Sequence, residues 1–240
     1  MIRKLHKKSE LAFSLVWIGI YIVLMSAADG ISTAIGVEKA VSAPICLILT
    51  LFLCLWIRAN GLEERYGLCR FKGKAGDFLF FLPLLPIVCV NFVFGVRMTL
   101  TPLETVLSIA DMLCVGVTEE IIFRGFLFKS LCGGSIKTAV AVSSITFGVG
   151  HIVNLLNGAE LVPTLLQIVY ASAAGFLFTV IVLRGGSLLP CMAAHSLLNS
   201  FSVIGGEGSE SGEAATAVFL TLWSLGYAVW ILRRTRGKQP

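Results

Sequence analysis

Charged residues are scarce in this sequence. Only 14% of the 240 residues are Asp, Glu, Lys or Arg, whereas 56% are hydrophobic. Soluble domains carry about 25% charged residues, so this balance excludes an ordinary soluble domain and indicates an integral membrane protein. The net charge is +5, but no basic helix face is interleaved with aromatic residues. We therefore expect a lipid bilayer around the chain and no nucleic-acid partner.

Several motif types are also missing. The seven cysteines include no C-x-x-C pair, which argues against a disulfide framework or a zinc cluster. Apolar and polar residues do not alternate with a period of two, which argues against a transmembrane barrel. There is no G-x-S-x-G serine nucleophile and no H-E-x-x-H metal helix. Without an internal repeat, a soluble domain or a long linker, residues 1–240 are expected to form a single transmembrane domain.

Apolar segments make up most of the chain. Each reaches or approaches the ~20 residues that a helix needs to cross the hydrocarbon core. They are 11–28, 40–57, 78–96, 103–128, 136–156, 161–183, 187–204 and 214–232. The first is longer than a signal-peptide core, which favours an uncleaved span. If the N-terminus is cytoplasmic, Lys39 and Arg97 are the only basic residues that fall in outer loops. This predicts an all-α integral membrane protein with about eight transmembrane helices and both termini cytoplasmic.

Three ionisable side chains lie close together inside the fourth apolar segment. A charge at membrane depth costs several kcal/mol unless it has a partner or reaches a water-filled cavity, so a functional role is the default interpretation. Glu120 and Arg124 are four residues apart and can pair on one helix face. Glu119 points about 100° away and has no partner on its own helix. We assign no role to Asp111 or Asn91.

Further polar side chains occur in the fifth and seventh segments. Phe147 and His151 lie in the fifth segment, and His195 and Asn199 share one helix face in the seventh. Counted at 1.5 Å per residue from the cytoplasmic ends, Glu119, His151 and His195 lie roughly 15, 21 and 12 Å deep. A single histidine in a membrane helix is often structural. The occurrence of these groups at one depth on three helices favours a common site.

These groups suit the hydrolysis of a peptide bond by an activated water molecule. Glu119 with His151 could deprotonate and orient the water, and His195 with Asn199 could hold the oxyanion. Arg124 would fix Glu120 in support. Alternatively, His151, His195 and a carboxylate could bind zinc with one position open for water. Because the H-E-x-x-H helix is missing, we favour a site without metal or other cofactor and keep zinc as the alternative.

The three motifs resemble those of a known family. E-E-x-x-x-R at Glu119–Arg124, F-x-x-x-H at Phe147–His151 and H-x-x-x-N at His195–Asn199 are similar to the CAAX protease and bacteriocin-processing family (CPBP, or Abi). That family includes the Ras-converting CAAX endopeptidase. The likeness covers about residues 104–204. It implies an eight-helix intramembrane endopeptidase with the first glutamate catalytic and a cavity open to the cytoplasm and lipid. The family has been described both as metalloprotease and as glutamate-type.

The resemblance leaves the substrate open. Family members cleave prenylated CAAX tails, mature bacteriocins or confer resistance to them, or process other membrane-bound peptides. The short loops favour a bacterial source, hence a multi-pass protein of a bacterial inner or plasma membrane acting on a membrane-associated peptide or protein. The alternatives are a non-catalytic bacteriocin-immunity or regulatory protein and a proton-coupled transporter. A transporter predicts inverted repeats or broken helices, which the sequence does not show.

Overall fold

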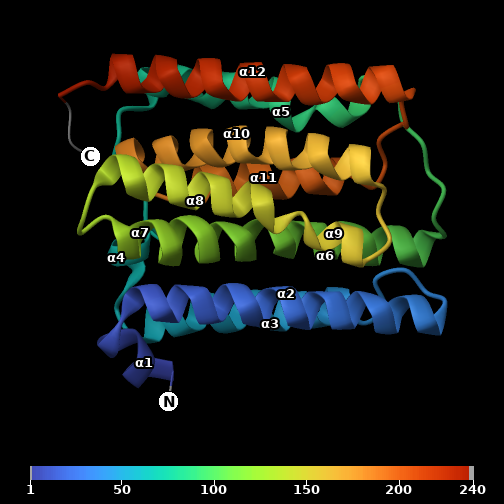
Figure 1. Cartoon of the computed structure of the whole chain (residues 1–240), viewed down its shortest axis with the longest axis horizontal. Helices are drawn as coiled ribbons and strands as arrows, with labels where there is room; N and C mark the ends of the chain where they lie inside the picture. Colours follow the sequence, from blue (N-terminus) through green and yellow to red (C-terminus); the bar gives the residue numbers. More distant parts are fainter. Residues whose placement is uncertain (1, 238–240) are drawn as a thin grey trace.

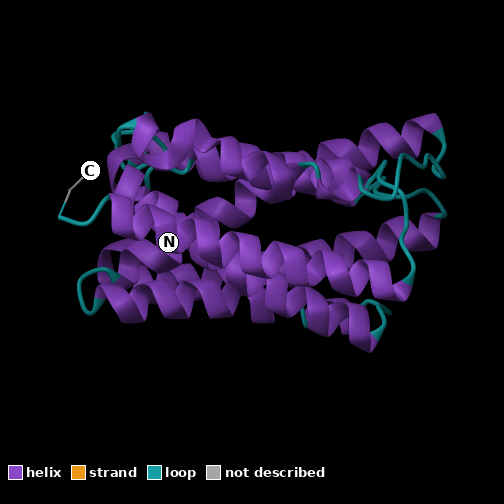
Figure 2. Cartoon of the chain, turned by 90° about the horizontal axis from the view of Figure 1, so that it is seen from above, coloured by secondary structure: helices purple, strands orange, loops and turns teal. Residues whose placement is uncertain are grey.

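The regular structure of this protein is helical. The structure is a computed structural model, and it describes residues 2–237. Within that range no strand is formed, and the only sheet-like feature is an isolated bridge between Val96 and Gly205. The long helices run roughly parallel to the long axis of the molecule (Figures 1 and 2).

The helices follow one another with short connections. In chain order they are α1 (Ile2–Lys8), α2 (Glu10–Ile35), α3 (Ser42–Ala59), α4 (Glu63–Tyr66), α5 (Leu85–Val88), α6 (Pro102–Glu119), α7 (Lys129–Leu131), α8 (Ile136–Gly150), α9 (Val153–Leu156), α10 (Leu161–Gly185), α11 (Leu189–Ser202) and α12 (Glu210–Arg234). Two 3-10 segments, η1 (Ala75–Leu84) and η2 (Val90–Phe92), flank α5. A π-helix, η3 (Glu120–Phe128), continues α6.

Six of the predicted spans are long and apolar enough to cross a membrane. They are Glu10–Ile35, Ser42–Ala59, Ala75–Phe92, Ile136–Leu156, Leu161–Gly185 and Glu210–Arg234. This confirms a multi-pass, all-helical membrane protein. The other two predicted segments are also helical, but α6 carries three carboxylates within 18 residues and α11 has only 14 residues. The count of eight and the cytoplasmic termini stay predictions.

The third predicted span is not a continuous helix. Leu79, Phe80 and Phe81 have φ values of 50°, 53° and 62°. These values belong to the left-handed region, in which a right-handed helix cannot continue. The apolar stretch that was expected as one helix over 78–96 is therefore divided into η1, α5 and η2.

The start and continuation of α6 have local causes. Thr101 and Glu104 form a capping box, and Pro102 occupies the first turn, where its missing N–H is not needed. At the other end, α6 passes directly into η3, all nine of whose residues are buried. Such π-helical turns occur frequently at functional sites. Both ionisable residues of η3, Glu120 and Arg124, lie inside the protein.

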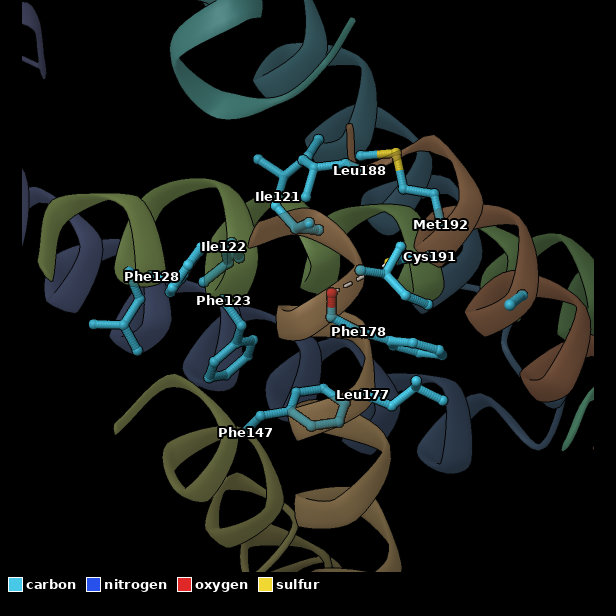
Figure 3. Close-up of a cluster of buried hydrophobic side chains, with 14 of the residues drawn as sticks. Ile121, Ile122, Phe123, Phe128, Phe147, Leu177, Phe178, Leu188, Cys191 and Met192 are labelled. Atoms are coloured by element: carbon cyan, nitrogen blue, oxygen red, sulfur yellow. Dashed lines mark hydrogen bonds between the residues drawn. The ribbon is translucent and has the colours of Figure 1, made fainter. Parts of the chain in front are cut away.

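The element η3 occupies the centre of the bundle. It packs against α2, α8 and α10, while α6 packs on α3 and α11, and α10 lies against both α8 and α12 (Figure 1). Figure 3 shows Ile121 and Phe123 of η3 in the same apolar cluster as Phe178 of α10 and Cys191 of α11. This packing keeps the turn that carries both glutamates inside the helical bundle.

Candidate active site

Two adjacent glutamates lie at the junction of α6 and η3. Glu119 is the last residue of α6, and its side chain is 14% exposed and lines a cavity of about 660 Å³. Glu120 begins η3, and its side chain is fully buried. The two carboxylates therefore have different surroundings, as expected from their angular separation on the helix. Glu119 faces the cavity, whereas Glu120 is enclosed by packed side chains.

Glu119 is contacted from two other helices. The hydroxyl of Tyr21 in α2 donates a hydrogen bond of 2.8 Å to its Oε1. The Nε2 atom of His195 in α11 lies 3.6 Å from its Oε2. Sequence reasoning did not identify Tyr21. The only signal for it was a tyrosine within an apolar span, where a buried hydroxyl usually has a hydrogen-bond partner.

Glu120 joins an arginine to a histidine. Its Oε1 accepts one hydrogen bond of 2.8 Å from Nη1 of Arg124 and another of 2.9 Å from Nδ1 of His195. The predicted pairing of Glu120 with Arg124 is therefore present. The contact with His195 was not predicted, because it depends on how α11 lies against η3. His195 consequently stands between the two glutamates, with one ring nitrogen toward each.

Arg124 is enclosed by aromatic rings. The side chain is fully buried, and its guanidinium carbon lies 3.9 Å from the ring centroid of Phe147 and 5.7 Å from that of Phe178. Such cation–π contacts are worth about 2 kcal/mol when they are desolvated. Gly175 leaves room for this arrangement, since a Cβ atom there would lie 3.0 Å from Nη2 of Arg124. Phe147, predicted as a supporting residue, thus contacts Arg124 directly.

His151 caps the end of α8 beside the same cavity. Its Nδ1 lies 3.1 Å from the carbonyl oxygen of Phe147. Because a carbonyl can only accept, Nδ1 carries the proton, and Nε2 of the neutral ring is left with a lone pair. The ring meets that of Phe147 edge-on, and Phe147 meets His195 in the same way. Among residues 2–237, His151 makes neither a hydrogen bond nor an ion pair with Glu119.

Asn199 lies one helical turn after His195 on α11. Both residues line the cavity, as do Glu119 and His151. The approach of α11 to α6 depends on Gly116, where an added Cβ would lie 2.5 Å from the backbone nitrogen of Ser196. All four residues predicted as catalytic therefore surround one cavity. The roles predicted for them are not tested by this arrangement.

The predicted zinc ligands are not grouped around one point. Within residues 2–237, no three His, Cys, Asp or Glu side chains are arranged so that they could hold a metal ion. Nδ1 of His195 is hydrogen-bonded to Glu120, and the rings of His151 and His195 each pack edge-on against the Phe147 ring. A zinc site with these ligands would require the side chains to rearrange.

The cavity extends from Glu119 toward one end of the bundle. Its lining continues to Asn157 and Gly206, in the loops at the end opposite to α1 (Figure 1). With the predicted cytoplasmic N-terminus, that end faces outward. The opening toward the cytoplasm that the resemblance implied stays a prediction, as does the topology itself.

Comparison with known proteins gives a family for the central part of the chain. Residues 101–201 match the family model described as type II CAAX prenyl endopeptidase Rce1-like. The matched region includes Glu119, His151, His195 and Asn199, but not Tyr21. Comparisons with curated proteins and with solved structures gave no match. Through residues 101–201, this chain is similar to the Rce1-like type II CAAX prenyl endopeptidases, the family that its three motifs also resemble, and this similarity supports an intramembrane endopeptidase.

Proposed function

We propose that this protein cleaves a peptide bond in a membrane-associated peptide or protein, using a water molecule activated by Glu119 and His151 and no metal ion. The observation that carries this proposal is the setting of Glu119. Its carboxylate lies on the wall of an intramembrane cavity, with one oxygen held by Tyr21 and the other facing His195. An oriented carboxylate with limited access to water is suited to act as a general base.

The first step is the attack of water on the peptide carbonyl. Glu119 accepts a proton from the water, and the lone pair on Nε2 of His151 helps to orient it. A new carbon–oxygen bond forms, and the carbonyl becomes a tetrahedral oxyanion. When the carbon–nitrogen bond then breaks, Glu119 returns the proton to the departing amine. The base is thereby regenerated, and no covalent intermediate with the enzyme is formed.

The oxyanion needs hydrogen-bond donors that are already in place. In this mechanism Nε2 of His195 carries a proton and donates to the oxyanion, and the amide of Asn199 donates from the same helix face. Glu120 holds His195 by its other ring nitrogen at 2.9 Å, which fixes the direction of Nε2. Arg124 in turn holds Glu120. We assign Glu120, Arg124 and Phe147 positioning roles, since none of them needs to touch the substrate.

The proposed substrate is an apolar or lipid-anchored peptide that enters the cavity from the bilayer. The surrounding helices are membrane-spanning in length and composition, and the family description names a prenyl endopeptidase. We propose a bacterial inner or plasma membrane as the location. This proposal rests on the short loops of the chain.

Glu119→Gln tests the catalytic assignment. The protein would be reconstituted in liposomes with a library of internally quenched apolar peptides, and Glu63→Gln in α4 would serve as a control with the same loss of charge. We expect a loss of cleavage of about a hundredfold to ten-thousandfold for Glu119→Gln, with normal thermal unfolding, and no loss for the control. Cleavage by Glu119→Gln at the wild-type rate would refute the role of Glu119. A folded wild-type protein that cleaves nothing would favour the immunity-protein alternative.

Exhaustive chelation tests the absence of a metal. We expect the cleavage rate of the wild-type protein to be unchanged after dialysis against a strong zinc chelator. If the rate falls and is restored by zinc, the metal-free mechanism is wrong, although the peptidase function would stand.

A further inference from the structure

The face of α6 that carries Glu119 bears a second carboxylate. Asp111, Val115 and Glu119 follow one another at intervals of four residues, and all three line the cavity. Asp111 is 1% exposed, and its carboxylate oxygens have no donor at hydrogen-bond distance among the described residues; the ammonium of Lys39 lies 3.6 Å from Oδ2. A buried acceptor without a donor costs about 1–3 kcal/mol. The carboxylate of Asp111, at the far end of this cavity wall, therefore lacks hydrogen-bond donors.

Helix α2 presents a matching face. Tyr21, Met25 and Asp29 are also spaced by four residues, and they line the same cavity. Tyr21 is bonded to Glu119 at one end. At the other end, Asp29 and Asp111 meet at Lys39, which follows α2. The wall formed by these two helices thus has a polar pair at each end and apolar side chains, Met25 and Val115, between them.

Lys39 is shared between the two aspartates. Its Nζ lies 2.8 Å from Oδ1 of Asp29 and 3.6 Å from Oδ2 of Asp111. Burial by itself lowers the pKa of Lys39, but the hydrogen bond and charge of Asp29 and the charges of Asp111 and Glu38 outweigh it, so that the pKa is raised. One ammonium thus faces two carboxylates, and the ionised cluster has a net charge of −1. Glu213, which also lines the cavity, adds no positive charge.

We propose that Asp29, Lys39 and Asp111 form a substrate subsite that binds a cationic side chain, such as lysine or arginine. An incoming ammonium or guanidinium would supply the donors that the oxygens of Asp111 lack and would balance the excess negative charge. This inference rests on the proposed function, since it concerns the substrate of the same cavity. Neither the motifs nor the matched family region assigns a role to Asp29 or Lys39.

The geometry sets the distance between the cation and the bond that is cleaved. Asp111 and Glu119 are eight residues apart on a helix, which is about 12 Å. An extended peptide covers that distance in three to four residues at about 3.3 Å each. The preferred substrate therefore has a basic residue three or four positions from the scissile bond and apolar residues between, which face Met25 and Val115.

Peptide binding tests this subsite separately from catalysis. The ligands would be fluorescent leucine–alanine peptides with one lysine, or with norleucine at the same position, offered to the Glu119→Gln protein in phosphatidylcholine liposomes. We expect the lysine peptides to bind about tenfold more tightly, which is the size of one charge-assisted hydrogen bond. With the wild-type protein, the bond cleaved should lie three or four residues from the lysine.

Three further variants, each combined with Glu119→Gln, decide the outcome. Asp111→Asn should reduce the lysine preference to about twofold or less, whereas Lys39→Gln should increase it, because the competing ammonium is removed. Glu63→Gln, at the other end of the bundle, should leave the preference unchanged. Since Lys39→Gln changes the preference in the opposite direction, misfolding of Asp111→Asn would not hide the result.

The possible results separate the two proposals. Equal affinity for lysine and norleucine peptides, including no measurable binding of either, would overturn the subsite. So would a lysine preference that survives Asp111→Asn or falls in Lys39→Gln. Lysine-selective binding without cleavage by the wild-type protein would leave the subsite standing and overturn the peptidase proposal. Cleavage by the wild-type protein with no lysine preference would support the peptidase proposal and overturn the subsite.

Discussion

Replacing Arg124 by methionine should strongly destabilise the protein. Both partners of the Arg124–Glu120 pair have fully buried side chains. Without the guanidinium, the Oε1 atom of Glu120 keeps only His195 as a donor, and its Oε2 already has none among the described residues. Removing one partner of a buried ion pair costs about 3–5 kcal/mol. At roughly 2–4 °C per kcal/mol for a chain of this size, the unfolding temperature should fall by about 6–20 °C.

The measurement is thermal unfolding in detergent, followed with a thiol-reactive dye. Cys46 and Cys191 are fully buried and become reactive only on unfolding. Arg97→Met is the matched control, because Arg97 pairs with Glu207 on the exposed surface. That pair should contribute no more than about 1 kcal/mol. A loss in Arg124→Met that is as small as the loss in Arg97→Met would refute the argument from burial.

A double variant separates the charge from the shape of the pair. Glu120→Gln combined with Arg124→Met leaves no unpaired buried charge, so most of the lost stability should return. Activity should not return, because a neutral glutamine holds His195 less firmly than the carboxylate does. If the double variant is as unstable as the sum of the single variants, Glu120 and Arg124 do not act as a pair.

Two other substitutions test how the site is held. Tyr21→Phe removes the hydrogen bond to Glu119 but keeps the ring, so kcat should fall about tenfold with little change in unfolding temperature; an unchanged kcat would show that the bond to Glu119 is not needed. Gly116→Ala places a Cβ atom 2.5 Å from the backbone of Ser196 and should cost about 1–3 kcal/mol together with activity. Gly226→Ala, with no atom within 4 Å of the added Cβ, is its control; equal stability of the two variants would contradict the close approach of α6 and α11.

Features that depend on neighbours along one helix could be predicted from the sequence. The low charge and the long apolar segments indicated membrane helices, because a helix in lipid must satisfy its own backbone and bury its apolar side chains. The spacing of Glu120 and Arg124 predicted their pairing, since residues four apart share a helix face. The three motifs also identified the family, which the match over residues 101–201 confirmed.

Contacts between helices were decided only by the tertiary structure. Tyr21 reaches Glu119 across 98 positions of the chain, and His195 reaches Glu120 across 75. Helical periodicity predicts which side chains share a face. It does not predict which other helix packs against that face, or the offset of the two helices along their axes. The break at Leu79–Phe81 and the meeting of Asp29, Lys39 and Asp111 have the same origin. Both arise from packing against segments distant in the sequence, which no local spacing encodes.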